Sequence, residues 1–295
     1  MIVDTSAPPL DLGSALARFG IERFFAEHWQ KRVLSLELDS SNFAQVRDEI
    51  GPLDIARLAN LAKGGTQAWI ASEHVAHSMV PVDAGNAGRF YELGATLYFL
   101  NVPLERLTHG VADFLGAPRA RVLASIFLTP PSGGASCHFD MHENFTVQLT
   151  GHKRWHVGAA PAVPGAAEGY ILGHELPASM RGMGPVREDT PLAMDLKPGS
   201  LLYVPRGTQH RTEAGVESWS LNISYFRTMW LDLLESGLKR RLAASPKWRA
   251  SVTGLAGPAR GENMLPELLA ELRLLLSDPR EMEQFCRDYL AMPDN

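Results

Sequence analysis

Residues 138–157 read "HFDMHENFTVQLTGHKRWHV" and carry the clearest structural pattern of the sequence. From 138 to 149 the side chains alternate in character. The odd positions are almost all apolar, and the even positions are His138, Asp140, His142, Asn144, Thr146 and Gln148. Because a β-strand sends alternate side chains to opposite faces, the pattern predicts a strand with one polar face. That face lies either in water, as in many antiparallel sheets, or inside a barrel that holds a ligand.

Two downstream stretches extend this pattern. "SWSLNISY", residues 218–225, alternates in the same way, with Ser220, Asn222 and Ser224 on its polar face. In "PGSLLYVPRGTQHR", residues 198–211, five residues after Gly199 form a predicted strand. Pro205 ends that strand because it has no N–H, and Gly207 permits a tight turn before His210. Such a turn brings one histidine to a fixed point beside a neighbouring strand.

Two histidines and a carboxylate suggest a metal site. His138, Asp140 and His210 are the ligand types of the facial triad in non-heme Fe(II) oxygenases. A His-x-Asp pair alone is a weak signal, because chance produces such a pair in a chain of this composition. A zinc hydrolase would also need a base near a metal-bound water, and no residue is placed for that role by spacing.

His142 is an alternative ligand because it shares the parity of His138 and Asp140. Ligands at i, i+2 and i+4 would span about 13 Å of extended chain, too far for one ion. The distant His210 is therefore preferred. His142 is expected to line the pocket or contact substrate, or else to be structural.

Composition excludes several classes of protein. The chain has 295 residues, 45% of them hydrophobic, and a net charge of -5. No run approaches the roughly 20 apolar residues of a membrane span. Without an excess of Lys and Arg, nucleic acid is not an expected partner, and the basic cluster at 238–249 is interpreted as a solvated helix face. Two cysteines, and an N-terminus without a basic flank and apolar run, predict a cytoplasmic protein.

The hydrophobic periodicity changes along the chain. Helical spacing at 11–31 and 42–63 predicts a mainly helical N-terminal third. Strand-like alternation follows from about residue 94, interrupted by a helix at 103–116 and a long irregular insertion at 157–198. Helical spacing returns after residue 227. This order, with about eight short strands in the middle, predicts a β-sandwich or barrel flanked by helices.

Beyond these patterns, the sequence resembles the JmjC-type, cupin-fold 2-oxoglutarate oxygenases, especially the bacterial ribosomal oxygenases and the asparaginyl hydroxylase that inhibits hypoxia-inducible factor. The resemblance rests on His138-x-Asp140, NFTVQLTGHKRW and PGSLLYVPRGTQH, and HWQKRVLSL at 28–36 is similar to the opening of that family. It implies a double-stranded β-helix at 91–226. A helical segment at 1–90 would pack on this barrel, and a helical segment at 227–295 would be a possible site of dimerisation.

The resemblance also implies roles for individual residues. His138, Asp140 and His210 would hold Fe(II), and Lys153, fifteen positions after the first metal histidine, would pair with the distal carboxylate of 2-oxoglutarate. A dicarboxylate buried in a barrel needs such a cation. The cosubstrate contacts would be completed by Asn144, Asn222 and the hydroxyl of Tyr98. Ala135 departs from the family pattern, which often has Thr or Ser there.

The implied activity is a 2-oxoglutarate-dependent dioxygenase that uses O2 to hydroxylate an unactivated C–H, on a protein or peptide side chain. An alternative acceptor is a free amino acid or natural-product intermediate. Asp140 argues against a halogenase, in which a small residue replaces the carboxylate. Two other classes stay open: a cupin that binds a ligand without turnover, and a different metal cupin that has no need of Lys153.

Overall fold

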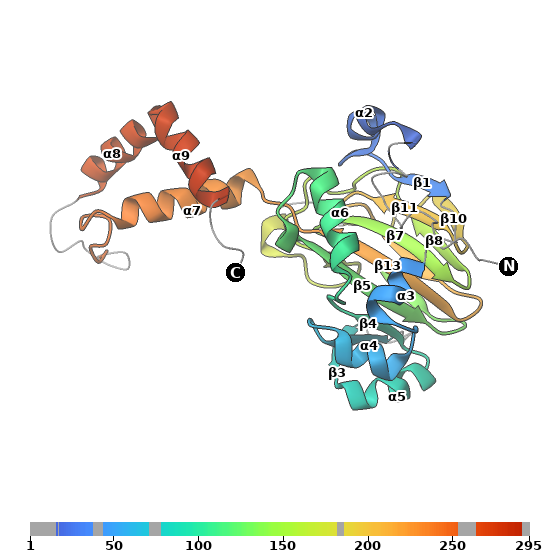
Figure 1. Ribbon diagram of the computed structural model, residues 1–295. Helices are drawn as coiled ribbons and strands as arrows, with labels where there is room; N and C mark the ends of the chain where they lie inside the picture. The colour runs from blue at the N-terminus through green and yellow to red at the C-terminus, as the bar shows by residue number, and fades with distance from the viewer. Residues whose placement is uncertain are drawn as a thin grey trace. The chain divides into compact units, whose positions relative to one another are not determined.

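The computed structural model describes residues 16, 18–37, 44–70, 78–181, 186–252 and 264–290. The chain divides into two compact units, Met1–Arg227 and Thr228–Asn295, which are described separately (Figure 1). Among the described residues, the first unit contains two sheets in which every pair of neighbouring strands is antiparallel. In spatial order, the larger sheet consists of β1 (Leu34–Glu37), β11 (Ser200–Val204), β7 (Glu143–Thr150), β13 (Ser218–Tyr225), β5 (Val122–Thr129), β4 (Thr96–Phe99), β2 (Thr66–Ile70) and β3 (Ser78–Val82).

The smaller sheet carries most of the residues that matter for the site. In spatial order, its strands are β10 (Leu192–Leu196), β8 (Lys153–Val157), β12 (His210–Glu213), β6 (Gly134–Phe139) and β9 (Tyr170–Ile171). Two antiparallel sheets with flanking helices confirm the predicted jelly-roll-like fold class.

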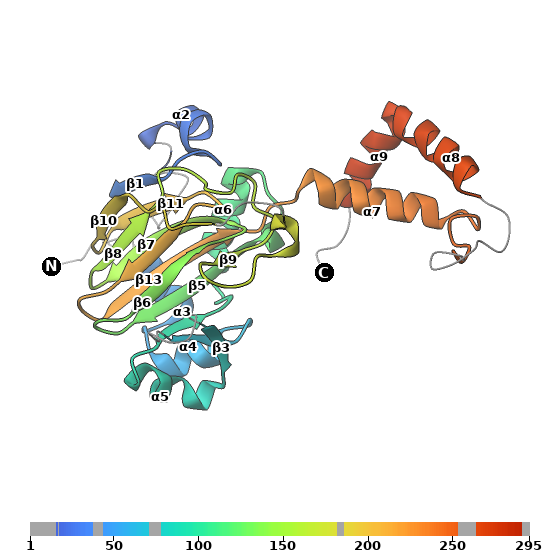
Figure 2. The same ribbon diagram turned by 180° about the vertical axis from the view of Figure 1, so that it is seen from behind.

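Short helices cover the outer side of the larger sheet. They are α2 (Ile21–Arg23) with a π-helical turn (Phe24–His28), α3 (Ala44–Ile50), α4 (Ile55–Leu61), α5 (Ala87–Glu92) and α6 (Glu105–Leu115), and 3-10 turns occur at Ala84–Asn86, Arg119–Arg121 and Ala178–Met180. Figure 1 shows α3 and α6 over β5 and β13, and Figure 2 shows β6, β8 and β9 from the opposite side. α6 ends at Gly116, which adopts the left-handed conformation (φ 62°) that glycine accepts without strain.

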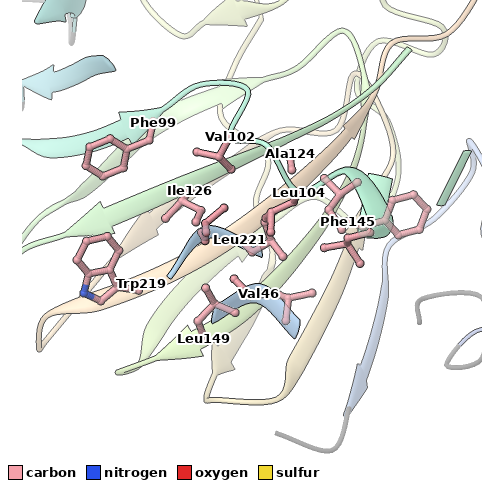
Figure 3. Packing of buried hydrophobic residues seen from close by; sticks show 14 of the residues in the cluster. Val46, Phe99, Val102, Leu104, Ala124, Ile126, Phe145, Leu149, Trp219 and Leu221 are labelled. Atoms are coloured by element: carbon pink, nitrogen blue, oxygen red, sulfur yellow. The ribbon is translucent and has the colours of Figure 1, made fainter. Parts of the chain in front are cut away.

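The apolar face of β7 and β13 packs beneath these helices. Phe145 and Leu221 are fully buried and belong to one hydrophobic cluster with Val46 of α3 and Leu107 of α6. Figure 3 shows Leu149 and Val46 in this cluster, together with Ile126 of β5. The odd-numbered apolar residues of 143–149 therefore form part of the main core.

The polar face of the same strands is buried as well. Asn144, Thr146 and Gln148 of β7 are at most 3% exposed, and Asn222 of β13 is 5% exposed. The alternative of a strand with one face in water is therefore wrong. The polar face points into the space between the sheets, as the barrel interpretation predicted.

Three expectations need correction. Residues 138–149 are not one strand, because β6 ends at Phe139 and β7 begins at Glu143, with a turn between them. The N-terminal third contains the expected helices α3 and α4, but also the strands β1, β2 and β3, whose short runs of four or five residues give little alternation to detect. The insertion at 157–198 is less irregular than expected, because it contains β9, while β10 confirms the strand-like alternation of PLAMDL at 191–196. Part of the helix expected at 11–31 lies outside the described residues.

The second unit is helical in its described part. It contains α7 (Trp230–Ala243), α8 (Leu265–Ser277) and α9 (Pro279–Leu290). α7 approaches α9 closely at Gly237, where a Cβ would come within 2.6 Å of the Phe285 ring, and the Arg241 guanidinium donates two hydrogen bonds to Glu281. Within the described ranges, no helix is both long and apolar enough to cross a membrane.

Candidate metal centre

Three donor side chains converge between β6 and β12. His210, the first residue of β12, pairs in register with His138 on β6, and Asp140 follows β6 directly. One ligand atom from each of these residues lies within 4.8 Å of the other two. Asp140 places Oδ1 4.0 Å from Nε2 of His138 and Oδ2 3.7 Å from Nε2 of His210. This is a set of two imidazoles and one carboxylate around a single point.

Backbone carbonyls orient both imidazoles. Nδ1 of His138 lies 2.7 Å from the Ser136 carbonyl oxygen, and Nδ1 of His210 lies 3.0 Å from that of Thr208. A carbonyl can only accept, so each Nδ1 carries the proton. Each Nε2 then presents its lone pair toward Asp140, which is the tautomer that binds a metal ion.

A hydrogen-bond network holds the carboxylate. The Asn144 amide donates to Oδ2 of Asp140 and accepts from Ser224 and Asn222, at 2.9 and 3.1 Å. Thr146 in turn donates to Asn222 at 2.9 Å. The buried polar face of β7 and β13 therefore supports Asp140, one of the three candidate metal ligands.

The electrostatic environment keeps these donors ready to bind a cation. Burial alone would raise the pKa of Asp140, but the nearby histidines and the Asn144 hydrogen bond hold that pKa below its usual value. Burial and the neighbouring His138 lower the pKa of His210 to about 4. At neutral pH the site therefore offers an ionised carboxylate and a neutral imidazole at position 210.

A cavity of about 400 Å³ opens beside these donors. Several buried polar atoms of its lining residues have no hydrogen-bond partner within the described part of the chain: Trp69 Nε1, Thr129 Oγ1, His142 Nδ1, Trp155 Nε1 and His174 Nε2. Leaving such an atom unsatisfied costs about 1–3 kcal/mol. Polar lining atoms without partners are expected where a bound molecule supplies the partners.

Lys153, the first residue of β8, also lines this cavity. Its side chain is buried, and its ammonium lies 5.6 Å from the centre of the Phe127 ring. Among the described residues, no carboxylate lies within ion-pair distance of it. Burial lowers the pKa of Lys153 to about 7. Such a desolvated cation gains from an anion entering the cavity.

The other residues predicted near the cosubstrate all line the cavity, but they make different contacts. Asn144 and Asn222 are engaged in supporting Asp140. Tyr98 stacks on Phe127 with ring centres 4.1 Å apart, and its burial raises the pKa of its hydroxyl. His142 lies in the cavity wall, stacked on Phe226 at 4.6 Å, and not among the three converging donors.

Sequence reasoning missed several cavity residues. Trp69 packs against His138 with ring centres 4.9 Å apart, and Trp155 stacks on His210 at 5.3 Å. Tyr170 and His174 come from the insertion at 157–198, whose sequence pattern carries no residue-level prediction. For Trp155 a signal existed, since it shares the parity of Lys153 on one strand. Trp69 carried no such signal, because β2 lies far from the motifs in sequence.

Fold and site define a class: a cupin-like double-stranded β-helix with a candidate two-histidine, one-carboxylate metal centre. Residues 101–233 match the family model described as "JmjC domain". The central part of the chain is therefore similar to JmjC domains.

Similar proteins are found both by sequence and by structure. The uncharacterized protein YxbC of Bacillus subtilis is 30% identical over 182 residues, which are 57% of this chain and 55% of that protein. The chain therefore spans about half the length of that relative. The ribosomal protein uL16 3-hydroxylase of Escherichia coli is 25% identical over 285 residues, 91% of this chain and 70% of that protein. A structure of YcfD, a ribosomal oxygenase from Escherichia coli in complex with cobalt and 2-oxoglutarate, aligns with a TM-score of 0.57 and 20% identity, covering 94% of this chain and 72% of that one. This structural likeness concerns the fold.

Proposed function

We propose that the protein is an Fe(II)- and 2-oxoglutarate-dependent oxygenase that hydroxylates a C–H bond of a protein or peptide side chain. The observation that carries the proposal is that one cavity holds both a convergent His138, Asp140 and His210 set and the buried ammonium of Lys153. The two features together match a metal ion and a dicarboxylate.

The donor set suits Fe(II). Two imidazoles and one carboxylate on one side of an ion leave positions open for other ligands. When bound, Fe(II) would supply the oxidising chemistry in which 2-oxoglutarate and O2 yield succinate, CO2 and a hydroxylated product. The chain's own part is to hold the ion through the two fixed Nε2 atoms and Asp140.

Lys153 and Thr129 are the residues we assign to the distal carboxylate of 2-oxoglutarate. The Lys153 ammonium supplies the countercharge, and a carboxylate beside it would raise its pKa again. The Thr129 hydroxyl is buried, lines the cavity and lacks a partner among the described residues. It can donate to the carboxylate, and it offers a hydroxyl where Ala135 cannot.

A polypeptide acceptor is supported by the Escherichia coli relative named as a ribosomal protein hydroxylase. The alternative, a free amino acid or natural-product intermediate, predicts a mass increase of about 16 Da, one oxygen atom, on a small molecule. The polypeptide proposal predicts that increase on a protein of cells that contain the gene, and its absence when the gene is deleted. We also propose the cytoplasm as the location, as the sequence predicted.

The test of the activity is a turnover assay with Fe(II), 2-oxoglutarate and O2. Wild type is expected to form succinate, and His138→Ala is expected to lose more than about 100-fold of this rate, because even changes outside the ligand set cost 10–100-fold. Equal succinate from both proteins refutes the oxygenase proposal. Absence of turnover with intact metal binding favours the non-catalytic cupin.

We further propose that the C-terminal helices form a homodimer. α8 has no buried residue among those described, and Leu265, Leu269 and Leu274 are 58%, 42% and 73% exposed. Exposed apolar surface of this kind marks association sites. A dimer in sedimentation at micromolar concentration is the expected result, and a monomer contradicts it.

A further inference from the structure

We infer that Glu143 is a positioning residue for the metal centre, acting through Tyr203 and Arg206. The inference rests on the proposed function, since it presumes that His138, Asp140 and His210 bind a metal ion. Glu143 belongs to the apolar face of β7, outside the cavity, and does not line it.

Burying the Glu143 carboxylate costs desolvation free energy, which a specific role would explain. Glu143 is the one charged residue at the odd positions from 143 to 149, and its exposed fraction is 0%. A buried carboxylate needs hydrogen bonds and a countercharge to offset its desolvation. An apolar residue here would continue the core that Phe145 and Val147 form. The partners of Glu143 therefore indicate what the charge does.

These partners come from the turn that leads to His210. The Tyr203 hydroxyl donates to Oε2 of Glu143 at 2.6 Å, and the Arg206 backbone N–H donates to the same oxygen at 3.4 Å. The Arg206 guanidinium Nε lies 3.6 Å from Oε1. In the described part of the chain, this is the ion pair that Arg206 makes, and its side chain is 13% exposed. One carboxylate thus fixes both the end of β11 and the turn after it.

The same turn is tied directly to two metal ligands. The Gly207 N–H donates to the Asp140 carbonyl at 2.8 Å, and the Thr208 carbonyl accepts from Nδ1 of His210. Gly207 adopts φ 75°, and a Cβ there would lie 2.0 Å from the Val163 carbonyl oxygen. The turn therefore has little room to shift by itself. A movement of Arg206 would be passed to Asp140 through Gly207 and to His210 through Thr208.

A third segment is attached from outside the barrel. The Gln30 N–H donates to the Tyr203 hydroxyl at 2.9 Å, and the Trp29 ring stacks on the Tyr203 ring at 5.9 Å. Because the hydroxyl oxygen accepts from Gln30, its own proton is free to point to Glu143. The carboxylate is thereby oriented from one side by Tyr203 and from the other by Arg206.

A positioning role and a merely stabilising role predict different results. A buried ion pair that only stabilises can be replaced by apolar residues of similar size at little cost. Loss of a group that orients metal ligands typically weakens metal affinity 10–100-fold. The double variant Glu143→Leu with Arg206→Met therefore separates the two roles, and Glu143→Gln tests the charge alone.

The experiment titrates metal-free wild type and variants with Co(II). Quenching of tryptophan fluorescence reports binding, since Trp69 and Trp155 pack on the two histidines, and the visible absorption of Co(II) reports its coordination. We expect a 10–100-fold weaker affinity and an altered spectrum for Glu143→Gln and for the double variant. The double variant should nevertheless unfold thermally near the wild-type midpoint. Leu107→Ala, a buried residue of α6, is the control: it should lower the midpoint and leave Co(II) affinity within about twofold.

The outcomes are distinct. If wild type has no stoichiometric Co(II) site, the proposed function itself fails. If wild type binds and both Glu143 variants bind within about threefold with an unchanged spectrum, the positioning role is refuted. Should Glu143→Gln not fold, Tyr203→Phe removes only the hydroxyl that orients the carboxylate. A drop of about threefold or more in Co(II) affinity then supports the role, and an unchanged affinity and spectrum refute it.

Discussion

The two faces of β7 and β13 are equally buried and entirely different in chemistry. On one face Leu221 and Val147 are fully buried among side chains of the main core. On the other, Asn222 and Thr146 are also nearly inaccessible, but they hydrogen-bond to one another within the network that supports Asp140. Burial alone therefore does not distinguish core from site; what the buried atoms contact does.

This difference implies a division of roles within single strands. Neighbouring residues such as Leu221 and Asn222 point to opposite faces, so one contributes to stability and the next to the candidate metal centre. Substitutions on the two faces should then separate stability from metal and ligand binding.

The largest effect is expected for the free energy of unfolding, from a substitution on the apolar face. Leu221→Ala should lower the free energy of unfolding by about 2–5 kcal/mol, through lost burial and the cavity left behind. Co(II) affinity should stay within about twofold, because Leu221 does not touch the polar network. Denaturant unfolding and fluorescence titration measure the two quantities. A large loss of Co(II) affinity at unchanged stability would contradict the roles assigned to the two faces.

On the cavity face, Lys153→Met should cost at least about 30-fold in 2-oxoglutarate affinity, since truncating one partner of a buried charge pair costs about 2–5 kcal/mol. The ligand-free protein should be no less stable, because the buried ammonium is itself unfavourable there. Calorimetry with the Co(II)-loaded protein and thermal unfolding test this. Unchanged affinity for the dicarboxylate would remove Lys153 from the site.

A smaller effect on Co(II) affinity is expected when the hydrogen bond from Asn144 to Asp140 is removed. Asn144→Ala should weaken Co(II) binding about 10–100-fold. Gln148→Ala is the matched control, because Gln148 lies on the same face of β7 but bonds to Ser218 and Ser220 at 2.7 and 3.0 Å. If both variants lose affinity equally, the network does not act through Asp140.

The smallest effect is a pH dependence. Burial lowers the pKa of Lys153 to about 7, and a bound dicarboxylate favours the protonated form. Binding above pH 7 then takes up a proton, so 2-oxoglutarate affinity should fall about 16-fold between pH 7 and 8.5, with a slope that approaches tenfold per pH unit at the upper end. Lys153→Arg, which stays charged, should flatten this dependence. A flat profile in wild type would contradict the assigned role of the ammonium.

Much of the fold and site was predictable because the signals are local. Parity along 143–149 separates the two faces correctly, and Gly199, Pro205 and Gly207 define the strand and turn before His210. His142 is not expected to bind the same ion as His138 and Asp140 if all three lie on one extended strand, because they would be too far apart. In the structure the chain turns after Phe139, so that reason does not apply. His142 nevertheless lies outside the converging set.

Other features had no local signal. The role of Glu143 is invisible in sequence, where it is one polar residue at an otherwise apolar parity. Trp69 and His174 reach the cavity from segments remote from the motifs. Their positions depend on strand pairing across long stretches of chain, such as β2 with β4 and β6 with β9.

Which residues have the chemistry of metal ligands, and which side chains share a strand face, could be predicted from the sequence, because ligand chemistry and strand alternation depend on neighbouring residues. That the polar face points inward, and that His210 pairs with His138, follows from how the strands assemble into two sheets. The physical reason is that a strand has two equivalent faces until other strands and helices cover them.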